Sequence, residues 1–153
     1  MKRVLALDVG ERRVGLARTD ETGTLAVPHG VYVRKGWEED VRKLAELARD
    51  LGAEALVVGL PLHMDGRVSP QAQEVRAFAE AVAREAALPL HFVDERWTTA
   101  EVERVLGEAG LPPRKRKGKV DALSAVLILQ AWLDRVRSQG GERDAGVHLL
   151  FGE

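Results

Sequence analysis

Short apolar runs alternate with helical patterns along most of this sequence, which restricts the chain to a small set of folds. Residues 4–7, 55–59 and 90–93 form short, largely apolar runs, as expected of strands that are buried on both faces. Residues 37–51 and 69–87 lie between these runs and have apolar side chains at helical spacing. Strands that alternate with helices pair in parallel through right-handed crossovers. The sequence therefore predicts an α/β fold.

The N-terminal part of the chain predicts two antiparallel strands beside that parallel sheet. Residues 14–18 follow the first apolar run closely enough to form a hairpin with it. A turn at residues 20–23 leads to a third strand at residues 24–33, which we expect to be interrupted near Pro28. Together these elements predict a mixed five-stranded sheet with strand 2 antiparallel and helices on both faces.

The C-terminal part of the chain predicts two further helices and a tail. Residues 98–101 have the spacing of a capping box, which predicts a helix that begins at Thr98. Residues 120–136 predict a last helix that is apolar almost all round and therefore buried. We expect one domain at residues 1–137, followed by a flexible C-terminal tail at residues 138–153 whose apolar end could pack against the domain.

Composition excludes several other classes of protein. A chain of 153 residues with 45% hydrophobic residues and a net charge of −1 can bury one core. It has no cysteine, which excludes disulfides, thiol catalysis and zinc ribbons, and its four histidines are not at ligand spacing. The longest apolar helical stretch, residues 122–133, is too short to cross a bilayer. We expect a cytoplasmic protein without membrane contact, as a monomer or a homodimer.

Positive charge is concentrated in one short segment, residues 114–119, while the rest of the chain is net acidic. Such a run is either a solvated loop or a contact to the phosphate backbone of a nucleic acid. Arginines beside acidic positions could also hold phosphates, although single arginines on a charged surface are often only solvated. The candidates for binding nucleic acid are Arg12, Arg13, Arg96, Arg114, Lys115, Arg116, Lys117 and Lys119.

Acidic residues stand where strands end and where the last helix begins. Asp8 closes the first strand, Asp94 and Glu95 close the fifth, and Asp121 begins the last helix. Each has an ordinary explanation alone, as a turn residue or as compensation of a helix dipole. Together they face one end of the sheet, where clustered carboxylates repel one another unless a cation such as Mg²⁺ or Mn²⁺ neutralises them. Such a cluster can hydrolyse phosphodiesters, which is nuclease chemistry.

The segment from Gly59 to Gly66 joins a strand to a helix and ends in Asp-Gly, so it is either a plain ordered turn or part of the site. His63 and Asp65 are further candidates for that site. Walker A, Gly-x-Gly-x-x-Gly, His-Glu-x-x-His and Gly-x-Ser-x-Gly motifs are absent. Their absence argues against P-loop, dinucleotide-binding, zincin and α/β-hydrolase enzymes.

Four motifs along residues 4–134 resemble, in order, those of the YqgF family. This family is similar to the RuvC-type Holliday junction resolvases, which have a ribonuclease H-like fold. It is described both as a nuclease that matures the 5′ end of pre-16S ribosomal RNA and as a junction resolvase. The resemblance implies a sheet of order 3-2-1-4-5. The matching segments are LALDVG (5–10) with RVGLA (13–17), VVGLPL (57–62) with MDG (64–66), DER (94–96) with TTA (98–100), and VDALSA (120–125).

The resemblance also implies a site and an activity. Asp8, Glu95 and Asp121 would be catalytic carboxylates that bind Mg²⁺ or Mn²⁺. Resolvases of the RuvC type have a glutamate at the end of the fourth strand, where this chain has Gly59-Leu60-Pro61, so Glu95 or Asp94 would replace it from the next strand. The implied function is a divalent-metal-dependent endonuclease. Its substrate would be pre-16S rRNA, free or in ribosomal precursor particles, or branched DNA.

Two other functions stay open. Residues 8–10 also look like the first phosphate motif of the actin and sugar-kinase superfamily, which would make the chain a nucleotide-binding phosphotransferase, although those enzymes normally need two such domains. The basic run alone could serve a non-catalytic ribosomal RNA-binding protein. For such a protein, binding survives Asp8→Asn and no product ever forms. Nothing in the sequence distinguishes RNA from DNA as the substrate.

Overall fold

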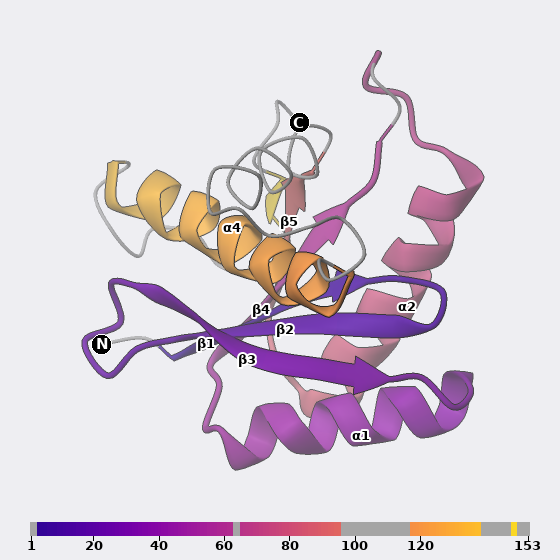
Figure 1. Cartoon of the computed structure of the whole chain (residues 1–153), viewed down its shortest axis with the longest axis horizontal. Helices are drawn as coiled ribbons and strands as arrows, with labels where there is room; N and C mark the ends of the chain where they lie inside the picture. The colour runs from indigo at the N-terminus through magenta and orange to yellow at the C-terminus, as the bar shows by residue number, and fades with distance from the viewer. Residues whose placement is uncertain (1–2, 63–64, 96–116, 139–147, 150–153) are drawn as a thin grey trace.

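The computed structural model describes residues 3–62, 65–95, 117–138 and 148–149, with the side chains of 117–121 and 148–149 outside that description. This part of the chain contains six strands and three helices, and the first three elements are strands (Figure 1). They are β1 (Val4–Val9), β2 (Arg13–Thr19), β3 (Ala26–Val33), α1 (Trp37–Asp50), β4 (Ala55–Leu60), α2 (Pro70–Ala86), β5 (Leu90–Asp94), α4 (Lys117–Ser138) and β6 (His148–Leu149).

The strands form one mixed sheet of order β3-β2-β1-β4-β5-β6. β2 is antiparallel to both of its neighbours, whereas the β1–β4, β4–β5 and β5–β6 pairs are parallel. The predicted order of the first five strands and the antiparallel strand 2 are therefore confirmed. The sixth strand comes from the segment predicted as a flexible tail, where His148 and Leu149 pair with His91 and Phe92. This pairing covers backbone groups of β5 that would otherwise form an open sheet edge.

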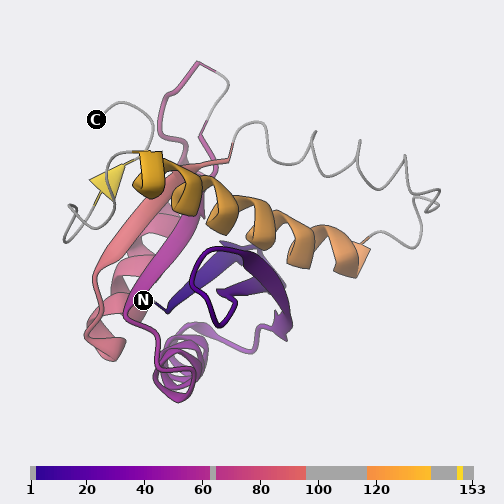
Figure 2. The ribbon, with the colours of Figure 1, turned by 90° about the vertical axis from the view of Figure 1, so that its left-hand side faces the viewer.

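Helices cover both faces of the sheet, with α1 and α2 on one face and α4 on the other (Figures 1 and 2). Side chains of β1 alternate between two cores, because successive residues of a strand point to opposite faces. Leu5 and Leu7 pack with residues of α1 and α2, and Val4 and Ala6 pack with residues of α4. The continuous apolar run at the start of the sequence therefore corresponds to a strand buried on both faces, as predicted.

Helix α2 begins where the sequence predicts it. Ser69 is the N-cap, its Oγ accepts a hydrogen bond from Ala72 N–H (2.9 Å), and Pro70 is the first helical residue. Helix α4 instead begins at Lys117, before the predicted start at Val120. Lys117 and Lys119 are therefore helical, and their prediction as part of a loop is wrong. Lysine is a good helix former, and the first turn of a helix can extend beyond its apolar positions.

Strand β3 is a continuous edge strand, so its predicted interruption near Pro28 is wrong. The irregularity there is a bulge, since Leu16 pairs with Gly30 and Ala17 with Pro28, which leaves His29 without an opposite residue. An edge strand tolerates proline because its outer N–H groups have no partner strand. The strand also begins later than predicted, because Thr24 belongs to the preceding turn, where its N–H donates to Asp20 Oδ1 (3.2 Å).

The helix predicted to begin at Thr98 lies outside the described residues. Within the described part of the chain, none of the helices is both long and apolar enough to span a membrane.

Candidate functional site

Two of the predicted carboxylates meet at one end of the sheet. Asp8 lies near the end of β1, and Glu95 follows the last residue of β5 directly. Because β1, β4 and β5 are parallel, they end at the same edge. Asp8 follows Val4 and Ala6 at intervals of two residues and so points to the face that α4 covers. The carboxyl groups of Asp8 and Glu95 are hydrogen-bonded to each other.

Gly59 makes this meeting possible, because β4 lies between the strands that carry the two carboxylates. A Cβ atom on Gly59 would stand 3.0 Å from Glu95 Oε2 and 2.5 Å from Cδ1 of Ile128 on α4. Glu95 therefore extends over β4 through the space that a side chain at position 59 would fill. Its backbone is anchored to the same strand, since Glu95 N–H donates to Leu60 O (3.3 Å). A glycine within a buried strand is the sequence signal for such a close approach.

Burial and then the negative charge of Asp8 raise the pKa of Glu95 well above its ordinary value, and Asp94 raises this pKa further. The pair thus holds a proton more readily than two separate carboxylates would. A divalent cation can take the place of that proton, and carboxylate oxygens are the donors that Mg²⁺ and Mn²⁺ prefer. The residues therefore fit the predicted metal.

The structure leaves other members of the predicted metal site outside its description. Asp121 belongs to α4, but its side chain lies outside the described residues, and so does His63. Among the side chains that are described, no group of three acidic or histidine residues has the arrangement of a metal site. Asp65 is exposed in the loop after β4, where it forms an ion pair with Arg67 (2.6 Å) and accepts a hydrogen bond from Arg67 N–H (3.0 Å).

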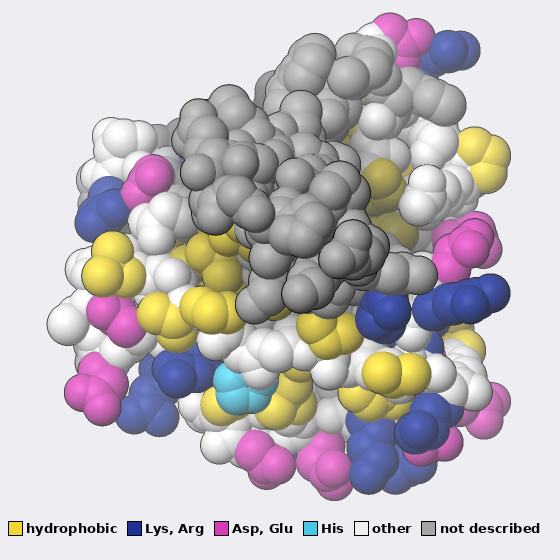
Figure 3. Space-filling view, viewed as in Figure 1, with side chains coloured by type: hydrophobic (Ala, Val, Ile, Leu, Met, Phe, Trp, Pro, Cys, Tyr) yellow, Lys and Arg dark blue, Asp and Glu magenta, His cyan; other side chains and the backbone are white. Residues whose placement is uncertain are grey.

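Basic side chains lie at the same end of the sheet as the carboxylates. Arg12 is exposed in the turn between β1 and β2, and Arg13 begins β2. Arg34 and Lys35, at the junction of β3 and α1, were missed by the sequence analysis, although Val33 pairs with Arg13 and so carries this junction to the same edge. Figure 3 shows Lys and Arg side chains gathered over this end of the molecule, on the right of the view.

The remaining predicted contacts to nucleic acid are not located by the structure. The positions of Arg96, Arg114, Lys115 and Arg116 lie outside the described residues. Lys117 and Lys119 lie in the first turns of α4, without described side chains.

Arg34 fixes the turn that follows Asp8. Its Nη1 donates to Gly10 O (2.9 Å) and its Nε to Asp40 Oδ2 (3.0 Å). The turn is also closed internally, since Gly10 N–H donates to Arg13 O (2.8 Å). The backbone two residues after Asp8 is therefore held from both sides, which restricts the position of that carboxylate.

Asp40 is fully buried and anchors Arg34. Its carboxylate also accepts hydrogen bonds from Tyr32 Oη (2.8 Å) and Lys35 N–H (2.9 Å). Burial alone would raise the pKa of Asp40, but the hydrogen bonds from Lys35, Arg34 and Tyr32 outweigh it and lower this pKa below its ordinary value. Burial and the same carboxylate raise the pKa of Tyr32 to about 12. Asp40 is thus a charged carboxylate whose hydrogen bonds hold the junction of β3 and α1 in place.

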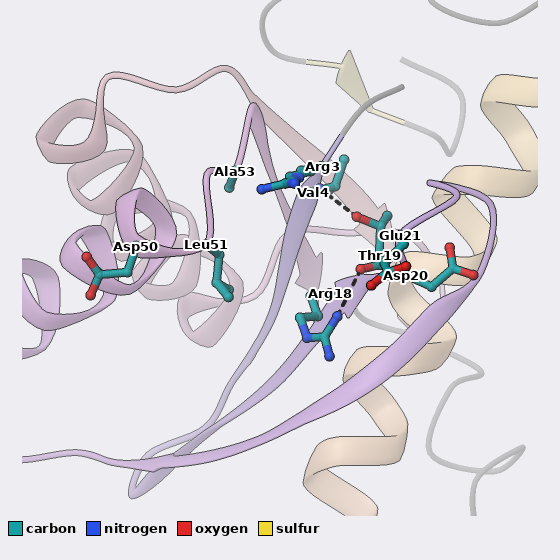
Figure 4. Close-up of a pocket in the computed structure, with 9 residues that line it drawn as sticks. All are labelled: Arg3, Val4, Arg18, Thr19, Asp20, Glu21, Asp50, Leu51 and Ala53. Atoms are coloured by element: carbon teal, nitrogen blue, oxygen red, sulfur yellow. Dashed lines mark hydrogen bonds between the residues drawn. The ribbon is translucent and has the colours of Figure 1, made fainter.

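A separate cavity of about 310 Å³ lies at the opposite end of the sheet, where β1 begins and β2 ends (Figure 4). A hydrogen bond from Val4 N–H to Thr19 Oγ1 (3.1 Å) joins the two strands there, and within β2 Arg18 Nη1 donates to Thr19 O (3.3 Å). Charged side chains of both signs line this cavity. Its position, at the other end of β1 from Asp8, separates it from the carboxylate site. The charged lining residues are Arg3, Arg18, Asp20, Glu21 and Asp50.

Comparison with known sequences decides the family. The profile of the RuvX family, described as a Holliday junction resolvase, matches residues 2–135. The chain belongs to the RuvX family. The resemblance predicted from the sequence is thereby confirmed, together with the class of enzyme, a nuclease that acts on phosphodiester bonds.

Relatives of this RuvX chain share most of its length. A protein of Moorella thermoacetica named "Putative pre-16S rRNA nuclease" is 44% identical over 138 residues, which cover 90% of the chain and 99% of the relative. A protein of Syntrophus aciditrophicus with the same name is 41% identical over 143 residues, which cover 94% and 95%.

The fold of the RuvX chain is similar to that of RuvC. The structure of T. thermophilus RuvC in complex with Holliday junction substrate superposes with a TM-score of 0.61 at 16% sequence identity, covering 93% of this chain and 99% of RuvC. A second T. thermophilus RuvC structure gives a TM-score of 0.54 at 18% identity, covering 88% of this chain and 96% of that one. The predicted ribonuclease H-like fold is therefore confirmed.

Proposed function

We propose that this chain is a divalent-metal-dependent endonuclease that processes the 5′ end of pre-16S rRNA, resolves branched DNA, or does both. The observation that carries the proposal is the hydrogen-bonded pair of Asp8 and Glu95, which reaches across Gly59 at the carboxyl edge of the sheet. The names of the curated relatives support the RNA substrate. The description of the family supports the DNA junction.

Asp8 and Glu95 would hold Mg²⁺ or Mn²⁺ together with Asp121 from α4. When bound, the ion supplies electrostatic stabilisation of the charge that develops on the phosphate during hydrolysis. The chain supplies the position of the carboxylates, because Arg34 restrains the turn after Asp8 and Gly59 leaves the space for Glu95. Preorganised charge of this kind needs no rearrangement when the reaction occurs.

Basic side chains near the carboxylates would bind the phosphate backbone. Arg12, Arg13 and Lys35 lie at the end of the sheet that carries Asp8. The basic run at residues 114–119, with Arg96, would extend this contact along the substrate. Such contacts are electrostatic, so binding should weaken steeply as salt rises.

We assign this activity to residues 1–137. A pre-rRNA substrate implies that the chain acts in the cytoplasm on ribosomal precursor particles. Symmetric cleavage of a four-way junction would instead require two active sites and therefore a homodimer.

The test measures cleavage of a labelled pre-16S 5′ leader and of a four-way DNA junction in Mg²⁺, by wild type, Asp8→Asn and Asp134→Asn. Asp134 is an exposed carboxylate near the end of α4, paired with Arg137, and serves as the matched control. We expect cleavage of at least one substrate by wild type and Asp134→Asn, and none by Asp8→Asn. Binding without cleavage by any of the three proteins would instead identify a nucleic-acid-binding protein.

A further inference from the structure

A small cavity of about 130 Å³ opens beside the turn that follows Asp8, on the face of the sheet covered by α1 and α2. Val9 at the end of β1 and Gly10 of the turn line it from the sheet. Two aromatic rings, those of Trp37 and Phe78, line it from the helices. The cavity is thus at the same end of β1 as the carboxylate pair, but on the opposite face of the sheet.

Trp37 leaves about half of its surface in water, with 47% of it exposed. It is the one aromatic residue among the large hydrophobic side chains that the described part of the chain exposes. Its ring is not free, because it meets the buried Phe78 ring edge to face, with centroids 5.2 Å apart and an interplanar angle of 78°. An exposed aromatic ring held in one orientation is a preformed surface for stacking.

Arg34 connects the two aromatic rings to the turn that follows Asp8. Its guanidinium lies over the Phe78 ring, 4.5 Å from the centroid, and also donates to Gly10 O (2.9 Å). One side chain, Arg34, therefore contacts both the Phe78 ring and the turn. A group bound against Trp37 would be held at a fixed position relative to Asp8.

The polar side chains around the cavity select the kind of group that fits. Gln71, Glu11 and Glu74 line it and are exposed, so they present oxygen acceptors at its opening. Two carboxylates repel a phosphate. They match the amino and ring N–H donors of a nucleobase, as acidic side chains do when they accept from the amino group of cytosine.

We propose that this cavity binds an unpaired nucleobase of the substrate, stacked on Trp37, with its amino group toward Glu11 and Glu74. The inference rests on the proposed nuclease function and adds a substrate requirement, a single-stranded nucleotide near the scissile phosphate. Stacking of a base on an aromatic side chain strengthens binding by about 5- to 150-fold. Adenine, guanine and cytosine carry the amino group, whereas uracil and thymine do not.

The test is a double-mutant cycle in which Trp37 and one base of the RNA are removed separately and together. Binding of labelled RNA with an adenine-rich single-stranded segment is measured by anisotropy, using the full chain with Asp8→Asn to prevent cleavage. An abasic nucleotide is moved along the segment, and each RNA is bound by proteins with Trp37 intact, Trp37→Ala or Trp37→Phe. Leu25→Ala removes an exposed apolar side chain from the β2–β3 turn and is the control.

At one position we expect the abasic nucleotide to weaken binding by about 5- to 150-fold when Trp37 is present and to have little further effect with Trp37→Ala. Trp37→Phe should retain part of the effect, and Leu25→Ala all of it. If the two losses simply add at every position, no base stacks on Trp37 and the inference is wrong, while the nuclease is unaffected as long as the wild type cleaves. If the wild type neither binds nor cleaves RNA or DNA, the proposed function fails first.

Discussion

The side chain of Glu95 fills the space over β4 that a side chain on Gly59 would need. A Cβ atom at position 59 would lie 3.0 Å from Glu95 Oε2 and 3.1 Å from Glu95 Cδ. The glutamate after β5 therefore depends on the glycine in β4, because a residue without a side chain leaves room for it. Glu95 thus reaches this position from the strand next to β4. The empty position beneath it lets the side chain reach Asp8.

Gly59→Ala should therefore impair cleavage more than stability. The new methyl group displaces the Glu95 carboxylate, which is a catalytic group under the proposed function, and misplacing such a group by about 1 Å can reduce the rate by about 100-fold. Overpacking of the core should lower the free energy of unfolding by only about 1–3 kcal/mol. Cleavage rates and thermal denaturation of the purified variant measure the two effects.

The added methyl group would also meet Cδ1 of Ile128 at 2.5 Å, so this contact needs its own control. Ile128→Val removes that atom and should reduce stability by about 0.5–1.5 kcal/mol. Combined with Gly59→Ala, it relieves the clash with α4 but not the clash with Glu95. Recovery of cleavage in the double variant would show that Ile128, and not Glu95, causes the defect.

Much of the fold could be predicted because its elements are locally encoded. Leu5 and Leu7 belong to a run that is apolar without interruption, as burial on both faces requires. Ser69 and Pro70 mark the start of α2 through capping and a fixed backbone angle. That Asp8 and Glu95 lie together could be predicted because the carboxyl ends of parallel strands meet at one edge.

Features that depend on contacts across the fold could not be predicted. The sequence leaves open whether Glu95 or Asp94 lies over Gly59, because that choice depends on how β4 pairs with β5. Arg34 appears as one cation on a highly charged chain until β3 brings it to Gly10. The two residues of β6 are too few to show a strand period, and their place follows from the free edge of β5.

Asp40→Asn should destabilise the chain in a pH-dependent way. Asp40 accepts hydrogen bonds from Arg34, Tyr32 and Lys35, and its pKa in the folded chain lies below the ordinary value of 3.8. Its contribution to stability is therefore present above this ordinary pKa and is lost as the pH falls through the folded-state pKa. We expect a loss of about 1–3 kcal/mol in urea denaturation near pH 7, and a smaller loss near pH 3.

Glu46→Gln is the matched control for Asp40→Asn, because Glu46 is an exposed carboxylate on the same helix. Its effect should stay within about 0.5 kcal/mol at both pH values. An equal loss for Asp40→Asn at both pH values would mean that the charge of Asp40 contributes nothing.

Ser69→Ala should remove the cap of α2 and its link to the loop after β4. Ser69 Oγ accepts from Ala72 N–H and donates to Pro61 O (3.2 Å), so the substitution loses two hydrogen bonds. The expected loss is about 1 kcal/mol, or a melting temperature lower by about 2–4 °C. Ser138→Ala, at the exposed end of α4, is the control and should leave the melting temperature nearly unchanged. A Ser69→Ala variant as stable as the wild type would show that Pro70 alone fixes the helix start.

Glu95→Gln should stabilise the metal-free chain while abolishing cleavage. The pKa of Glu95 lies well above 4.5, through burial and then the charge of Asp8, so the folded chain binds a proton there that the unfolded chain releases. Stability from this group is therefore complete below the ordinary pKa and falls as the pH rises toward the folded-state pKa. Glutamine keeps the shape of the side chain and removes the charge, so the penalty near neutral pH disappears.

Melting temperatures in a chelator distinguish this effect from a general gain in packing. Near pH 7 we expect Glu95→Gln to melt above the wild type, and near pH 4 the two should melt together, since Glu95 is then protonated. Added Mg²⁺ should raise the melting temperature of the wild type more than that of the variant, because the ion binds the charged pair. If the melting temperatures of Glu95→Gln and the wild type differed by the same amount at both pH values, repulsion between Asp8 and Glu95 would be absent from the folded chain. The proposal that this pair binds a cation would then be wrong.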